Sequence, residues 1–271
     1  MIQSIYIESG IEAHPRTQSI LGRFPKASHI RCDRYGEIFN PKAQSFRLQK
    51  QQPALILAEK YENQVLPAPD GYGVGGKRNY YFSHMLNCLY DCRYCFLQGM
   101  FRSAHYVLFV NYEDFAKEIE KIIARHADEE VWFFSGYDCD SLAMEPVTEF
   151  VEYILPLFAR NPNAFLELRT KSTQIRGLLD TPPLKNVIVA FSFTTQSISD
   201  ALEYKVPKLD KRINAMRELQ RAGWPVGLRL DPLIYHEDYK CDYLDLYNRL
   251  FDALDADKLH SVSLGSFRLP K

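Results

Sequence analysis

Two patterns of apolar residues alternate along most of this chain. Short apolar runs such as 131–134 and 187–193 are typical of strands buried on both faces of a parallel sheet. In 112–126 apolar residues recur every three or four positions instead, which predicts an amphipathic helix. The pattern predicts strands at 79–85, 131–134, 165–170, 187–193, 226–230 and 261–267, and helices at 112–126, 146–160, 173–179, 209–222 and 242–254.

Six strands separated by helices predict an α/β fold with a parallel sheet. The pattern alone fits an open, incomplete barrel as well as a doubly wound sheet. Proline and glycine cluster at 67–76, so we expect a boundary between an N-terminal α/β extension (1–76) and a core (77–271). The formal G-x-G-x-x-G at Gly71, Gly73 and Gly76 follows prolines and precedes a strand, which argues against a dinucleotide site.

Composition and charge are those of an ordinary globular protein. The 271 residues are 46% hydrophobic and 25% charged, which excludes a disordered or collagen-like chain. No apolar run approaches the roughly 20 residues of a membrane helix and no secretory signal is evident, so we expect a cytoplasmic protein without a membrane partner. The net charge is −1, but residues 11–50 carry a surplus of five positive charges, a candidate phosphate contact or simply a solvated face.

Three of the six cysteines form a tight cluster. Cys88, Cys92 and Cys95 have the spacing C-x3-C-x2-C. Three thiolates can bind three irons of a four-iron cubane and leave the fourth iron open to an exogenous ligand. A structural zinc site is an alternative that needs a fourth ligand, and a redox pair at Cys92 and Cys95 is another. The nearest candidates for the fourth zinc ligand are His84, His105 and Cys139.

The cysteine string follows the first strand of the core and has the aromatic Tyr94 before its third cysteine. In these features it resembles the radical S-adenosylmethionine (SAM) superfamily. Further segments make most of the chain similar to the spore photoproduct lyase family within it. These segments are 94–98, 106–111, 139–145, 168–171, 190–193, 209–213 and 222–227.

This resemblance implies a partial (βα)6 radical SAM barrel with two cofactors, a 4Fe-4S cluster and SAM. The cluster would cleave SAM by one electron, and the 5′-deoxyadenosyl radical would take a hydrogen from the substrate. Cys88, Cys92 and Cys95 match the cluster ligands of the family. Asp140, Lys171 and Ser192 match residues that contact SAM.

The chain departs from the family pattern where the lyase returns hydrogen to its product. By alignment, Tyr137 stands where the lyase has its hydrogen-donor cysteine, and Cys139 stands where it has a SAM-contacting serine. Phe96 replaces a tyrosine of the same relay. Tyr94, Tyr137 and Cys139 are therefore our candidates for the catalytic hydrogen relay.

Three functions follow from this reading. The first is a lyase-like radical SAM enzyme that acts on DNA photolesions and takes electrons from a carrier such as flavodoxin or ferredoxin. The second is a radical SAM enzyme with a substrate other than DNA. The third is a zinc-stabilised binding protein without enzymatic activity.

Overall fold

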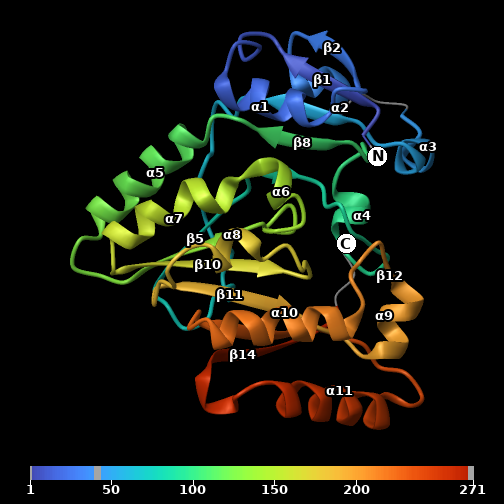
Figure 1. Cartoon of the computed structure of the whole chain (residues 1–271), viewed down its shortest axis with the longest axis vertical. Coiled ribbons are helices and arrows are strands. Elements are labelled where there is room, and N and C mark those ends of the chain that lie inside the picture. The colour runs from blue at the N-terminus through green and yellow to red at the C-terminus, as the bar shows by residue number, and fades with distance from the viewer. Residues whose placement is uncertain (1, 40–43, 268–271) are drawn as a thin grey trace.

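The computed structural model describes residues 2–39 and 44–267. Most strands of the N-terminal extension belong to a five-stranded sheet, here called the N-terminal sheet, in the order β2-β1-β3-β8-β6. Figure 1 shows this sheet at one end of the molecule, with the barrel strands beyond it. Its strands are β1 (Ser4–Glu8), β2 (Ser28–Cys32), β3 (Leu55–Ala58), β6 (Met85–Leu86) and β8 (Tyr106–Phe109).

The core forms a second sheet in the order β14-β13-β11-β10-β9-β5-β4. Its first six strands are mutually parallel and run in chain order, and only β4 pairs antiparallel. This confirms the predicted series of six strands in an open, partial barrel. The strands are β4 (Leu66–Pro67), β5 (Arg78–Phe82), β9 (Val131–Ser135), β10 (Ala164–Thr170), β11 (Val187–Ser192), β13 (Val226–Leu233) and β14 (Leu259–Ser266).

Helices cover one face of the barrel sheet, and their apolar sides share one core with the strands. Phe133 of β9 and Phe191 of β11 belong to this core, as do Phe115 and Leu219 of the helices. Of the helices in the described ranges, α1, α2 and α3 lie at the end of the molecule that carries the N-terminal sheet (Figure 1). The helices are α1 (Pro15–Arg23), α2 (Tyr35–Phe39), α3 (Phe46–Gln51), α4 (Leu97–Met100), α5 (Tyr112–Arg125), α6 (Glu145–Thr148), α7 (Phe150–Arg160), α8 (Arg176–Leu179), α9 (Gln196–Leu202), α10 (Leu209–Arg221), α11 (Tyr239–Ala253) and the 3-10 turn η1 (Ala256–Lys258).

The other face of the barrel strands carries a separate apolar cluster of Trp132, Phe134 and Ile188. Because side chains alternate between the two faces of a strand, Phe133 and Phe134 belong to different clusters. Tyr72 and Val74, from the glycine-rich segment before β5, pack against this second cluster. The segment therefore lines the inside of the barrel.

Two details differ from the sequence-based expectations. The helix predicted at 146–160 is two helices, because Glu149 between them has the left-handed φ of 49°. The two sheets do not divide the chain at residue 76, since β6 and β8 of the later segment complete the N-terminal sheet and β4 of the earlier segment joins the barrel sheet.

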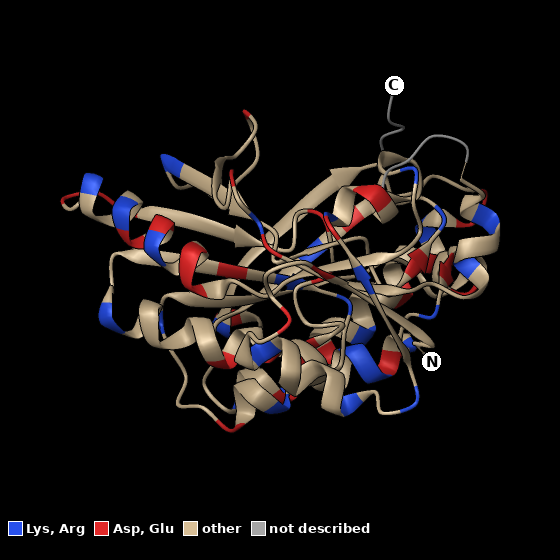
Figure 2. Ribbon diagram, turned by 90° about the horizontal axis from the view of Figure 1, so that it is seen from above, with Lys and Arg blue, Asp and Glu red and all other residues tan. Residues whose placement is uncertain are grey.

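Charged residues of both signs are interspersed along the helices, as the alternating blue and red segments in Figure 2 show. Several basic residues of the N-terminal surplus pair with carboxylates of the protein itself, among them Arg16 with Glu113 and Lys50 with Asp91. Lys42 of this surplus lies outside the described residues. No helix in the described ranges has the length and apolar character needed to cross a membrane.

Candidate cofactor site and active site

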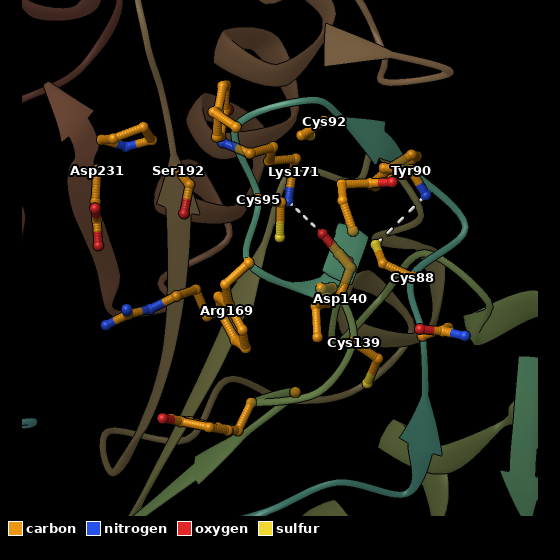
Figure 3. Close-up of a pocket in the computed structure, with 18 of the residues that line it drawn as sticks. Cys88, Tyr90, Cys92, Cys95, Cys139, Asp140, Arg169, Lys171, Ser192 and Asp231 are labelled. Carbon is orange, nitrogen blue, oxygen red and sulfur yellow. Dashed lines mark hydrogen bonds between the residues drawn. The ribbon is translucent and has the colours of Figure 1, made fainter. Parts of the chain in front are cut away.

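A cavity of about 440 Å³ opens at the carboxyl ends of the barrel strands. In α/β barrels this end carries the chemistry. All nine residues singled out from the sequence line it, and Figure 3 shows most of them around one space. They are Cys88, Cys92, Cys95, Tyr94, Tyr137, Cys139, Asp140, Lys171 and Ser192.

The three clustered cysteines lie on the loop between β6 and α4. A two-stranded ribbon fixes the middle of this loop, because β7 (Asp91–Cys92) pairs antiparallel with β12 (Glu203–Tyr204). The backbone N–H of Arg93 donates to the carbonyl of Leu202 at 2.8 Å and extends the pairing. Cys92 is thereby held directly opposite Glu203.

Burial dominates the electrostatics of the three thiols. It raises the pKa of Cys92 to about 12 and raises the pKa values of Cys88 and Cys95 as well. Free thiols in this loop are therefore protonated at neutral pH, and a bound metal or cluster must displace those protons. The Sγ of Cys88 accepts a hydrogen bond from the backbone N–H of Tyr90 at 3.4 Å.

The donor set suits a cluster better than a single ion. Within the described ranges, no three His, Cys, Asp or Glu side chains converge so that they could hold one metal ion. A cubane instead binds each cysteine to a different iron, so its ligands need only surround a common space. Cys88, Cys92 and Cys95 meet that requirement because they line the same cavity.

Asp140 joins two strands of the barrel. It lies just after the tight turn at Gly136, where φ is 78° and an added Cβ would lie 2.9 Å from the backbone nitrogen of Ser141. Its Oδ2 accepts from the backbone N–H of Lys171 at 2.6 Å, and its Oδ1 accepts from Thr170 Oγ1 at 2.7 Å. Oδ1 also accepts from two backbone N–H groups in its own loop. These bonds make Asp140 a positioning residue for the end of β10.

Lys171 follows β10 and extends toward a buried carboxylate, Glu203, that the sequence pattern does not single out. Its Nζ lies 3.1 Å from Glu203 Oε1. Glu203 also receives a hydrogen bond from the hydroxyl of Tyr94, and its Oε2 lies 2.7 Å from Arg212 Nη2. Burial opposes ionisation of Glu203, but Lys171 and Arg212 outweigh it and lower its pKa to about 2.

The ammonium of Lys171 retains capacity for an anionic ligand. The Nζ is buried, and its contact with Glu203 lacks hydrogen-bond geometry. A buried donor without a hydrogen-bond acceptor is costly unless a ligand satisfies it. This orphaned donor, on the wall that also carries the cysteines, fits the carboxylate of an amino-acid cofactor.

The remaining candidates lie on neighbouring walls of the cavity. Ser192 ends β11, and Arg212 Nη1 donates to its carbonyl at 3.2 Å. Cys139 is buried, and burial raises its pKa well above that of a free thiol. The ring of Tyr137 lies 4.4 Å from that of Tyr81, measured between centroids, and also contacts two further aromatic rings, Tyr72 and Phe96.

A charged group from the inside of the barrel completes the lining. Arg169 of β10 donates to Glu167 Oε1 at 2.9 Å, and Arg229 of β13 binds the other oxygen of the same carboxylate at 2.6 Å. Glu167 and Arg229 are fully buried, whereas Arg169 reaches the cavity. Figure 3 shows Arg169 and Asp231 on the same side of the space, away from Cys88. The sequence pattern did not single out Arg169.

Comparison with known proteins places these features in a family context. The sequence matches the family model described as spore photoproduct lyase over residues 77–268. It is 27% identical over 177 residues to the spore photoproduct lyase of Bacillus subtilis (strain 168), covering 65% of this chain and 52% of the relative. Identity to the enzyme of Geobacillus sp. (strain Y412MC61) is 23% over the same length. The match thus spans about half the length of these curated relatives.

Solved structures share the fold. A mutant spore photoproduct lyase with bound AdoMet and dinucleoside spore photoproduct superposes with a TM-score of 0.88 at 18% identity, covering 100% of this chain and 80% of the other. A second structure of the lyase, complexed with the dinucleoside spore photoproduct, gives a TM-score of 0.85 at 18% identity over 97% of this chain and 77% of the other.

Proposed function

Because the chain belongs to the spore photoproduct lyase family, we propose that it is a radical SAM enzyme acting as a carbon–carbon lyase on nucleic acid. One observation carries the proposal. Three cysteines with the C-x3-C-x2-C spacing and the buried ammonium of Lys171 line a single cavity at the carboxyl end of a six-stranded partial barrel.

Each side of the cavity has its own role in the proposal. When bound, a 4Fe-4S cluster and SAM supply one-electron cleavage of the sulfonium and a 5′-deoxyadenosyl radical. Cys88, Cys92 and Cys95 hold the cluster. Lys171 binds the SAM carboxylate, Ser192 lies beside the cofactor, and Asp140 fixes the backbone on which Lys171 stands.

The opposite wall is the proposed substrate side. It carries the charged side chains of Arg169 and Asp231, and the rings of Tyr137 and Phe96 line the same cavity. Aromatic rings can stack on a nucleobase, and a guanidinium and a carboxylate can bind the acceptors and donors on its edge. Cys139 is the proposed group that returns a hydrogen atom to the product. The ring of Tyr137 is packed among three aromatic rings, and Tyr94 is held away from this role by its hydrogen bond to Glu203.

The proposal includes two conditions. A protein that carries single electrons, such as flavodoxin or ferredoxin, must reduce the cluster. The enzyme acts in the cytoplasm, because cellular DNA and such reduced carriers are found there.

The decisive assay for the substrate uses anaerobically reconstituted enzyme, SAM, dithionite and ultraviolet-irradiated DNA. Formation of 5′-deoxyadenosine together with loss of the thymine lesion supports lyase activity on DNA. If 5′-deoxyadenosine forms while the lesion persists, repair of that lesion is excluded. The second candidate, a radical SAM enzyme with another substrate, then replaces it. Tyr137 at the expected position of the donor cysteine is the observation that favours this candidate.

A further inference from the structure

A basic depression lies beside the ribbon that holds Cys92. Its lining residues are Thr173, Lys205, Val206, Pro207, Lys208 and Lys211. We propose that this depression, together with the adjoining side chains of Arg93 and Tyr204, is the docking surface for a small acidic protein that carries single electrons. The inference rests on the proposed function, because only an enzyme that reduces a cluster needs such a partner.

Unpaired positive charge is the first argument. Lys205, Lys208 and Lys211 are exposed, and over residues 2–39 and 44–267 no carboxylate lies within the 4.0 Å ion-pair distance of any of them. Arg93 is also exposed, and its guanidinium lies 4.3 Å from the centroid of the exposed Tyr204 ring. Three lysines thus line the depression, and Arg93 and the exposed Tyr204 ring lie at the adjoining ribbon of β7 and β12.

The carboxylates nearest in sequence do not cancel this charge. Asp91 pairs with Lys50 at 2.6 Å, and Asp210 pairs with Arg249 at 2.5 Å. Glu203 is buried and shared between Lys171 and Arg212. The surface therefore keeps a positive potential, which is complementary to an acidic partner and speeds their association.

Position relative to the cysteines is the second argument. Val206 lines the depression and also packs against the small apolar cluster of Tyr90, Cys92 and Ala143. Cys88 and Cys95 pack against the same cluster. A protein seated in the depression is therefore separated from the proposed iron ligands by one short ribbon and the Val206 side chain.

A basic surface could also bind nucleic acid. The position of the depression relative to the cavity favours the electron-carrier protein instead. Among the described residues, none lines both the depression and the cavity. The substrate side of the cavity, at Arg169 and Asp231, lies away from Cys88 and Cys92 in Figure 3. A partner bound in the depression thus approaches the cluster from outside and leaves the substrate entrance free.

The experiment compares two double variants with the same change in charge. Lys208→Glu/Lys211→Glu alters the depression and leaves Lys205, which has a positive φ, untouched. Lys26→Glu/Lys185→Glu alters two exposed lysines elsewhere and serves as the control. The probe is a bacterial flavodoxin, whose affinity is measured by calorimetry and whose reduced form drives cleavage of SAM. Dithionite drives the same cleavage without docking.

We expect the depression variant to bind flavodoxin about tenfold or more weakly at low salt, and to lose flavodoxin-driven cleavage by a similar factor. Its dithionite-driven cleavage stays at the wild-type level, and the control variant keeps both. Equal flavodoxin affinity in the two variants would overturn the proposal. So would weaker binding of duplex DNA by the depression variant with an unchanged flavodoxin-driven rate, since that identifies a nucleic-acid contact. If the wild type fails to cleave SAM even with dithionite, the proposed function itself is wrong.

Discussion

Lys171 Nζ lies 3.1 Å from Glu203 Oε1, and this contact links the end of β10 to the ribbon residue directly opposite Cys92. Glu203 also holds Arg212, whose side chain is fully buried. One carboxylate thus fixes the cofactor-side lysine and supports the cysteine loop from behind. The two ion pairs explain how the charged carboxylate of Glu203 can be buried in the protein.

Glu203→Gln should be among the most destabilising single changes in the protein. It keeps the shape of the side chain but leaves Arg212 and Lys171 buried without a negative partner, which costs about 3–5 kcal/mol. Urea denaturation of the apoprotein measures the loss. Glu149→Gln, which removes the partly exposed partner of Arg23, should cost no more than about 1 kcal/mol. Similar losses in the two variants would contradict the assigned role.

The cysteines divide into two groups. Alanine at Cys88, Cys92 or Cys95 should abolish iron and sulfide incorporation during anaerobic reconstitution, because a three-thiolate site has no spare ligand. Alanine at Cys32 or Cys241 should leave the iron content at the wild-type level, since neither residue lines the cavity. Iron and sulfide analysis checks both. Full iron content in a Cys92→Ala protein would refute the ligand assignment.

Hydrogen return should depend on Cys139 rather than on Tyr137. Cys139 lies next to the anchored Asp140 at the wall of the cavity, whereas the Tyr137 ring is packed among three aromatic rings. With the cognate substrate in deuterated water, Cys139→Ala should still form 5′-deoxyadenosine but lose transfer of solvent deuterium into the product. Tyr137→Phe should keep that transfer. Mass spectrometry of the product would reverse the assignment if the two variants exchanged these results.

His84 should make the protein sensitive to acid. The ring is buried and stacked on Phe150 at a centroid distance of 4.1 Å, and burial lowers its pKa from 6.5 to about 3. Between these values the unfolded chain binds a proton that the folded protein does not. The neutral, buried His84 therefore stabilises the folded protein fully above pH 6.5. As the pH falls from 6.5 toward 3, the free energy of unfolding decreases by about 1.4 kcal/mol per pH unit.

His84→Phe removes the titrating group and keeps a flat ring against Phe150. Urea denaturation of both proteins between pH 7 and pH 4 (about the range of the histidine titration) should show a shallower loss of stability in the variant. Parallel pH profiles would show that His84 is not responsible.

The barrel could be predicted because its signals are local. Runs such as 187–193 are continuous and rich in β-branched and aromatic residues, which favours buried parallel strands whatever their neighbours are. The cysteine spacing is equally local. Each of these two signals, the apolar run and the cysteine spacing, spans only a few consecutive residues and can be read directly from the sequence.

The composition of the N-terminal sheet and the role of Glu203 could not be predicted, because they depend on contacts between segments that are distant in the sequence. β8 is not among the strands that the sequence pattern predicts, and its pairing with β3 is what assigns it to the N-terminal sheet. Glu203 appears in the sequence as an isolated acidic residue after a helix. Its role arises because β12 pairs with β7 and because Lys171 and Arg212 approach it from β10 and α10. No rule on the spacing of residues in a sequence predicts that these three side chains come into contact.

Reductive cleavage of SAM tests the central claim most directly. Anaerobically reconstituted protein is incubated with SAM and dithionite, and 5′-deoxyadenosine is measured by chromatography. We predict that 5′-deoxyadenosine forms with the wild type and is lost in Cys88→Ala, Cys92→Ala and Cys95→Ala. Protein that contains one zinc and no iron or sulfide, and forms no 5′-deoxyadenosine, would contradict the account.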